Sequence, residues 1–184
     1  MLNQETPTTG LEGFYRDELR DAAGQILWDS GWRKNLIVIN CRRLLSGFMC
    51  NQELTRGIQG LQVGAGDPAW DVGLPPAPLA TDTQLVDPAP HLVPVNFNYL
   101  DPVTGEVSIS GTGDPIPTNR LQIVATLGPG VPSWPDASHV SGTLREFGLV
   151  GQLGGATVLI NAVRHVAIPK DPVSTLVRTI QLVF

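Results

Sequence analysis

ATVLINAVRHVAIPKDPVSTLVRTIQLVF, residues 156–184, is the stretch that decides the fold. Apolar and polar residues alternate on both sides of the turn at 169–174, which is the pattern of half-buried β-strands. We expect two strands that form a hairpin central to the fold. The buried faces should carry Ile160, Ala162, Val166 and Ile168 in the first strand, and Leu176, Ile180, Leu182 and Phe184 in the second.

Two arginines interrupt these apolar faces near their middles, Arg164 in the first strand and Arg178 in the second. An arginine in such a place either reaches the sheet margin with its charged end or meets a carboxylate. Glu146 lies in the neighbouring strand candidate LREF. We therefore expect Glu146 to be the partner within this chain.

Alternating segments farther upstream predict the remaining strands. A hairpin is expected first, with its turn at 22–24 ending in a glycine. The other strand candidates lie at 57–63, 93–99, 107–109, 121–127 and 142–150. Together with the C-terminal stretch they make about eight strands.

One segment, residues 35–49, predicts a helix. Asn35 is a suitable N-cap, and Ile37, Cys41, Leu44 and Phe48 form one apolar stripe at helical spacing. A single amphipathic helix of this length buries its stripe against a sheet. We expect this stripe to belong to the core.

The composition agrees with a β-rich fold. The 184 residues include 20 Gly and 16 Pro, and only 16% are charged. Gly and Pro interrupt helices and suit many turns. The expected fold is mainly β: an antiparallel, jelly-roll-like β-sandwich of about eight strands with one α-helix packed on it. A partner-bound or flexible arm at 1–11 precedes a single domain at 12–184.

Two long Pro/Gly loops, at 67–90 and 128–138, each carry a tryptophan. An ordered loop of such length in a small domain usually contacts something. Trp70 and Trp134 in these loops, with Tyr99 on a strand, are therefore the candidate interface or ligand contacts.

Charge and motifs exclude several function classes. The net charge of −5 disfavours a general nucleic-acid surface, and no apolar run is long enough to span a membrane. Cys41 and Cys50 are too few for a disulfide scaffold, and the histidines lack metal-ligand spacing. We find no nucleophile motif and no acid–base pair. The sequence thus predicts no catalytic residues, no cofactor and no metal.

Several segments together resemble a loose group of phage virion proteins from tail, baseplate or fibre gene clusters. They are GWRKNLIVINCRRLLSGF (31–48), GLQVGAGDPAWD (60–71), ATDTQLVDP (80–88), LREFGLVG (144–151) and LINAVRHVAIPKDPVSTLVRTIQLVF (159–184). The similarity covers residues 20–75, 80–90 and 140–184, and the order of the segments carries it more than any one motif. Gly64-Ala65-Gly66 replaces the group's usual Gly-Thr-Gly, and Phe147 stands where a small apolar residue is usual.

The resemblance implies a non-enzymatic virion building block, or a component of a related contractile injection system. Its partners would be other virion proteins and copies of itself, and it would be made in the host bacterial cytoplasm. Two alternatives stay open. One is a capsid decoration (cement) protein, and the other is a fibre-tip carbohydrate-binding module that recognises a surface glycan through exposed aromatic rings.

Overall fold

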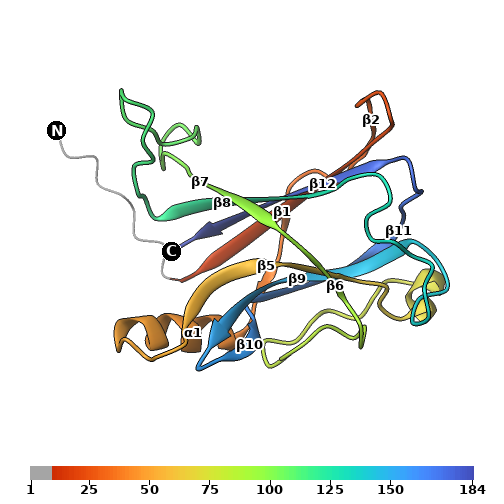
Figure 1. The fold of residues 1–184 in the computed structure, drawn as a ribbon, viewed down its shortest axis with the longest axis horizontal. Coiled ribbons are helices and arrows are strands. Elements are labelled where there is room, and N and C mark those ends of the chain that lie inside the picture. The colour runs from red at the N-terminus through yellow and green to blue at the C-terminus, as the bar shows by residue number, and fades with distance from the viewer. Residues whose placement is uncertain (1–9) are drawn as a thin grey trace.

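The computed structural model describes residues 10–184, which form two antiparallel β-sheets packed face to face, with one helix beside them (Figure 1). The first sheet has the order β2 (Ile26–Asp29), β1 (Glu12–Arg20), β12 (Thr175–Val183), β8 (Arg120–Leu127) and β7 (Val95–Tyr99), and β3 (Arg33–Lys34) also pairs with β1. The second has the order β4 (Leu36–Ile37), β11 (Asn161–Pro169), β9 (Thr143–Leu153), β5 (Arg56–Gly64) and β6 (His91–Val93), and β10 (Ala156–Leu159) pairs with β9. The mainly β sandwich expected from the sequence is confirmed.

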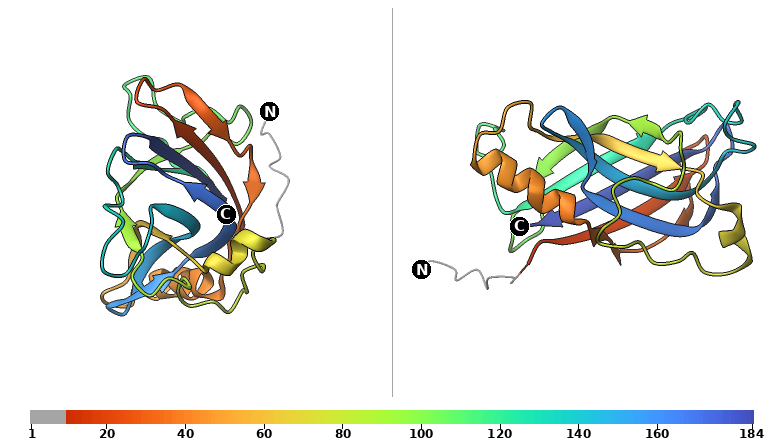
Figure 2. Two further views of the ribbon diagram at one scale, coloured as in Figure 1. Left: turned by 90° about the vertical axis from the view of Figure 1, so that its right-hand side faces the viewer. Right: turned by 90° about the horizontal axis from the view of Figure 1, so that it is seen from below.

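The core lies between the two sheets, as the end-on view in Figure 2 shows. Alternate residues of β12 point into it: Leu176, Ile180 and Leu182 are each at most 1% exposed. β9, β5 and β11 of the second sheet supply facing side chains. Period-2 alternation in the sequence therefore identified the inner face of these strands correctly.

The C-terminal stretch does not form the expected hairpin. β11 belongs to the second sheet and β12 to the first, so the turn between them passes from one sheet to the other. Alternation in the sequence shows which face of a strand is buried but not which strand pairs with it. Two consecutive strands can pair in one sheet, or they can lie in opposite sheets and pack their apolar faces across the core.

Two residues of the predicted buried faces, Val166 and Phe184, depart from expectation. The predicted first strand is divided at Ile160 into β10 and β11, and its register shifts between Arg164 and Ile168. Such an irregularity rotates the side chains that follow it, and Val166 is accordingly 48% exposed. Phe184, just beyond β12, is 44% exposed and is not part of the closed core.

The helix α1 (Ile39–Met49) is shorter than predicted. Its N-cap is Val38, not Asn35, because Leu36 and Ile37 pair with β11 as the short strand β4. Sheet pairing supplies the backbone hydrogen bonds that a first helical turn would lack. Only Cys41 and Leu44 of the predicted stripe are buried, since Ile37 lies in β4 and Phe48 is 42% exposed.

The remaining elements follow the sequence more closely. The first hairpin turns at 22–24, with Gly24 at φ 82°, a left-handed conformation that glycine adopts without strain. The segment at 93–99 divides at Pro94 into β6 and β7, and carries the chain from the second sheet to the first. Residues 107–109 form only isolated bridges within a projecting hairpin at 100–116.

The loop at 67–90 is irregular as predicted, apart from the short 3-10 helix η1 (Pro68–Val72). Of the predicted arm at 1–11, residues 1–9 lie outside the described residues. Leu11 packs against the core.

Candidate functional site

Two adjacent side chains of β9 fasten the long loop at 67–90 to the body. The Arg145 guanidinium donates to both carboxylate oxygens of Asp71, over 2.8 and 2.7 Å, and to the Ala65 carbonyl. The Glu146 carboxylate accepts from the backbone N–H groups of Val86 and Asp87, over 3.0 and 2.7 Å. The loop is therefore held by charge-assisted hydrogen bonds near both of its ends.

Burial and charge shift the pKa of both carboxylates. Burial raises the pKa of Glu146, and the two backbone N–H groups oppose that rise. The Arg145 hydrogen bonds lower the pKa of Asp71.

Glu146 was predicted to pair with Arg178 or Arg164, and this is wrong: Arg164 pairs with Asp82 at 3.0 Å and Arg178 with Asp17.

The second loop is joined to the first through His139. Its Nε2 lies 3.1 Å from Asp87 and its Nδ1 lies 2.8 Å from Asp136. The His139 and Asp87 side chains are only 3% exposed, so the contact is closed to solvent. The Trp134 ring stacks on the imidazole with a centroid separation of 3.8 Å. This cluster joins the two long loops into one surface.

The three predicted contact residues lie in different surroundings. Trp70 is 8% exposed, with the Arg164 guanidinium 5.6 Å from its ring centroid, and it packs in the interior. Trp134 is half-buried against His139 and the core. Tyr99 lines an apolar groove beside β7. The structure does not bring these three rings together into one aromatic platform.

That apolar groove lies between β7 and the projecting hairpin at 100–116. Its volume is about 390 Å³. The lining side chains are Phe97, Asn98, Tyr99, Val107, Ser108, Ile109, Pro115 and Leu121. We call it the β7 groove. Phe97 and Leu121 also line a smaller apolar hollow against α1, so the two hollows adjoin.

A cluster of exposed apolar side chains lies at the other edge of the same sheet. Ile26, Leu27, Trp28 and Trp32 are 52%, 60%, 37% and 47% exposed. We call residues 26–34 the tryptophan segment. The sequence placed a hairpin here but did not indicate that both faces of β2 are open, because a short run of consecutive apolar residues is also typical of a fully buried strand. Neither Trp28 nor Trp32 was among the predicted contacts.

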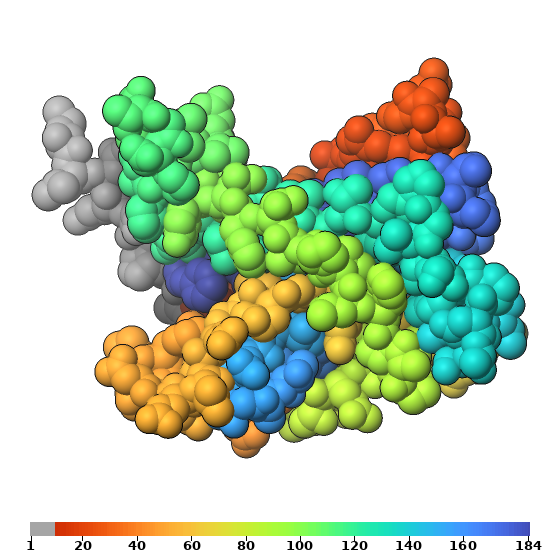
Figure 3. All heavy atoms as spheres, in the orientation of Figure 1, coloured from red at the N-terminus to blue at the C-terminus, as the bar shows by residue number. Residues whose placement is uncertain are grey.

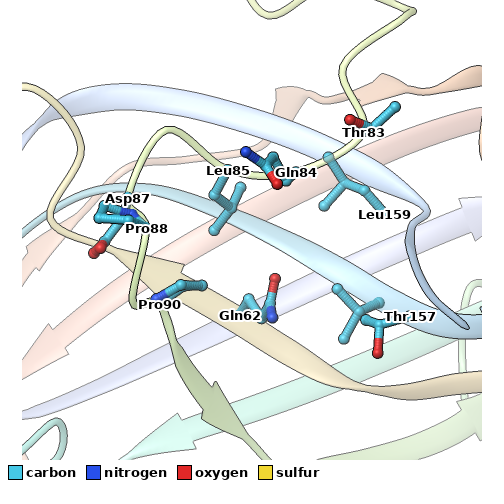
Figure 4. A pocket seen from close by; sticks show the side chains of 10 residues that line it. Gln62, Thr83, Gln84, Leu85, Asp87, Pro88, Pro90, Thr157 and Leu159 are labelled. Carbon is cyan, nitrogen blue, oxygen red and sulfur yellow. The ribbon is translucent and has the colours of Figure 1, made fainter.

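A third surface is a polar groove on the outer side of the second sheet, with a volume of about 380 Å³. Figure 4 shows Gln62, Thr83, Gln84 and Thr157 around it, above an apolar floor that includes Leu85 and Leu159. Within the described residues, the side-chain amides and hydroxyls of those four residues make no hydrogen bond to the protein. They are open to a ligand or to solvent.

The cysteines occupy different places. Cys41 is buried, and burial raises the pKa of its thiol to about 11. Cys50 is exposed at the end of α1. Among residues 10–184, no group of three or more His, Cys, Asp and Glu residues is arranged to hold a metal ion. No helix in the same range is long and apolar enough to cross a membrane.

No family model, no curated protein and no solved structure matches this chain.

Proposed function

We propose that the protein is a non-enzymatic structural subunit of a phage particle, associated with the tail, baseplate or fibre. It works through contacts with other virion proteins and with copies of itself, and reaches the virion after synthesis in the host bacterial cytoplasm. The observation that carries the proposal is the large apolar surface left open at both edges of the first sheet. Contiguous apolar patches of this kind mark protein–protein contacts.

The fastened loops support the same proposal. Ionic and charge-assisted hydrogen bonds from β9 hold the loop at 67–90, and His139 holds the loop at 128–138 against it. A surface that is ordered before it binds loses less conformational entropy on association. The low content of charged residues, 16%, leaves little charge on the surface to oppose packing between subunits.

Mass spectrometry of purified particles tests this function. The expected result is that the chain is present in fixed stoichiometry with the tail or baseplate proteins and remains after washing at high salt. Immunogold labelling then separates the tail from the capsid, where a decoration protein would lie. A chain that is abundant in the infected lysate but absent from the washed particles would overturn the proposal.

A second candidate function is the recognition of a surface glycan, and the polar groove in Figure 4 favours it. Uncharged amides and hydroxyls can form hydrogen bonds with the hydroxyl groups of a sugar, and the apolar floor can pack against its C–H faces. A glycan array with the full chain tests this candidate. Binding that is lost in Gln62→Ala and kept in Trp134→Ala would assign the sugar to this groove. Loss in Trp134→Ala alone would assign it to the loop at 128–138.

A further inference from the structure

The tryptophan segment has the composition of a binding anchor. Trp28 and Trp32 expose a third to a half of their surface, and Leu27 exposes 60%. β2 pairs with β1 only at Glu18–Arg20, so its other edge is unpaired within the described residues. Tryptophans that project from a free edge are typical of residues that dominate binding energy once a partner buries them.

The β7 groove, at the opposite edge of the same sheet, has complementary properties. It is predominantly apolar and its volume of about 390 Å³ lies within the range of pockets that bind ligands. Phe97, Val107 and Ile109 on its walls are 47%, 46% and 56% exposed. Large aromatic side chains suit such a groove, because they bury much area with few rotatable bonds.

The charges beside the two surfaces are opposite in sign. The projecting hairpin at 100–116 carries Asp101, Glu106 and Asp114 and has no Lys or Arg. Trp32 is followed directly by Arg33 and Lys34. The nearby Asp29 is already neutralised by Arg16, at 3.0 and 2.6 Å, and Lys34 lies 3.3 Å from Glu12. Among the described residues Arg33 has no carboxylate within salt-bridge distance.

The positions of the two surfaces determine the kind of contact that they can make. β2 and β7 are the first and last strands in the order β2-β1-β12-β8-β7. Figures 1 and 3 show the tip of the first hairpin and the hairpin at 100–116 rising from opposite ends of this sheet. A two-fold dimer that pairs two different patches needs both of them on the same side of each copy. Patches on opposite edges do not meet this requirement, but they can join one copy to the next in a ring or filament.

We infer that the tryptophan segment of one copy binds in the β7 groove of the next copy, so that the occupant of the groove is a second copy of this chain. Trp32 and Trp28 enter the apolar groove, and Arg33 faces the acidic hairpin. The edges of β2 and β7 come together, and the first sheet continues from copy to copy. This inference rests on the proposed structural function and names the surfaces that it uses.

The test begins with the full chain in solution, observed by light scattering after size-exclusion chromatography and by sedimentation. The wild-type mass is expected to rise above that of the 19.7 kDa monomer as the concentration increases. Two variants remove one surface each: Leu27→Asp on the tryptophan segment and Ile109→Asp in the groove. Both residues are more than half exposed. A charge on either apolar surface disfavours its burial, and the two new carboxylates repel each other, so the altered surfaces do not pair when the variants are mixed. Each variant should move the association midpoint at least about tenfold to higher concentration.

Mixing the two variants distinguishes a head-to-tail contact from a symmetric one. Each variant keeps the surface that the other lacks, so an equimolar mixture should form a 1:1 heterodimer and nothing larger. Val140→Ser is the matched control, because Val140 is 94% exposed and lies on neither surface; it should associate like the wild type. The thermal unfolding transition of each variant verifies that it is folded.

Three outcomes would overturn the inference: a wild-type chain that stays monomeric at high micromolar concentration, a folded single variant that associates like the wild type, or a variant mixture that grows beyond the dimer. These failures are separable from failure of the proposed function. A monomeric chain that is found in washed particles would leave the structural role standing and remove only the contact between copies. A chain that associates but is absent from particles would remove the virion role and leave the head-to-tail contact standing.

Discussion

The ion pair of Asp17 and Arg178 lies in the interior between the two sheets, whereas the polar contacts of Arg145 and Glu146 lie under the loop at 67–90. The two groups of contacts differ in their solvent exposure and in their hydrogen-bond partners. Between the sheets, the Arg178 guanidinium donates to both oxygens of Asp17, over 2.6 and 2.8 Å, and the two side chains are at most 1% exposed. Arg178 also stacks on Phe147 at 3.6 Å and lies 3.2 Å from the Nε2 of His165. Under the loops, Glu146 accepts from backbone N–H groups and Arg145 pairs with Asp71, whose side chain is 41% exposed.

The two groups of contacts have different structural roles. Asp17 and Arg178 stand directly opposite each other on β1 and β12, and Phe147 and His165 belong to the other sheet. That cluster therefore fixes a strand pair and joins both sheets. The contacts of Arg145 and Glu146 determine where a loop lies on a body that is already folded. Breaking the first should lower the global stability, whereas breaking the second should mainly release the loop.

The largest effect is expected for Asp17→Ala. The substitution leaves the fully buried Arg178 without its carboxylate, and breaking a buried pair in this way costs about 3–5 kcal/mol. Urea unfolding measures the change. The double variant Asp17→Leu with Arg178→Met removes both charges and should cost much less. Equal losses in the single and double variants would show that shape, and not charge, is what this cluster supplies.

The next effect is a dependence on pH that originates in the same cluster. Burial, followed by the Arg178 charge, lowers the pKa of His165 from 6.5 to about 4. The unfolded chain therefore binds the proton first as the pH falls, and stability is lost from pH 6.5 down to about pH 4. The loss is about 3 kcal/mol over this window. Urea midpoints at several pH values measure it, and His165→Gln should flatten the dependence; an unchanged slope would assign it to other groups.

A smaller loss is expected for Glu146→Gln under the loop. The amide can accept from only one of the two N–H groups at Val86 and Asp87, and its own NH₂ group meets the other. An unsatisfied buried donor costs about 1–3 kcal/mol. The pH dependence of stability caused by Glu146 has the opposite sign to that caused by His165. Burial raises the pKa of Glu146, so its ionisation reduces stability as the pH rises through the carboxyl range, and the variant should lose this contribution.

The smallest effect is expected for Asp71→Asn. Its carboxylate is partly exposed, so solvent screens the pair with Arg145 and the global unfolding midpoint should change little. Limited proteolysis within 72–79 should nevertheless become faster, because the loop loses a bidentate anchor. Glu53→Gln, at an exposed turn, is the matched control. A cleavage rate equal to that of the control would show that Glu146 and His139 hold the loop without Asp71.

Local sequence patterns predicted many of the strands and the first turn correctly. The alternation in 121–127 and 175–183 predicted β8 and β12 and their buried faces, and the glycine at the end of the 22–24 turn predicted the first hairpin. The candidate site was predicted less well. Both long loops were identified, but Trp70 proved to be an interior residue, and the open apolar side chains of the tryptophan segment and the β7 groove were recognised only in three dimensions.

The sequence by itself determined most of the long strands and most of their apolar faces, because these properties depend on neighbours one or two residues away. Only the tertiary structure decided that β11 and β12 lie in different sheets, that residues 36–37 pair as a strand and do not begin the helix, and that Arg178 meets Asp17. That last pair is separated by 161 residues. No local preference selects one carboxylate over another at such separation, since the choice is made only when β1 and β12 align and place Asp17 opposite Arg178.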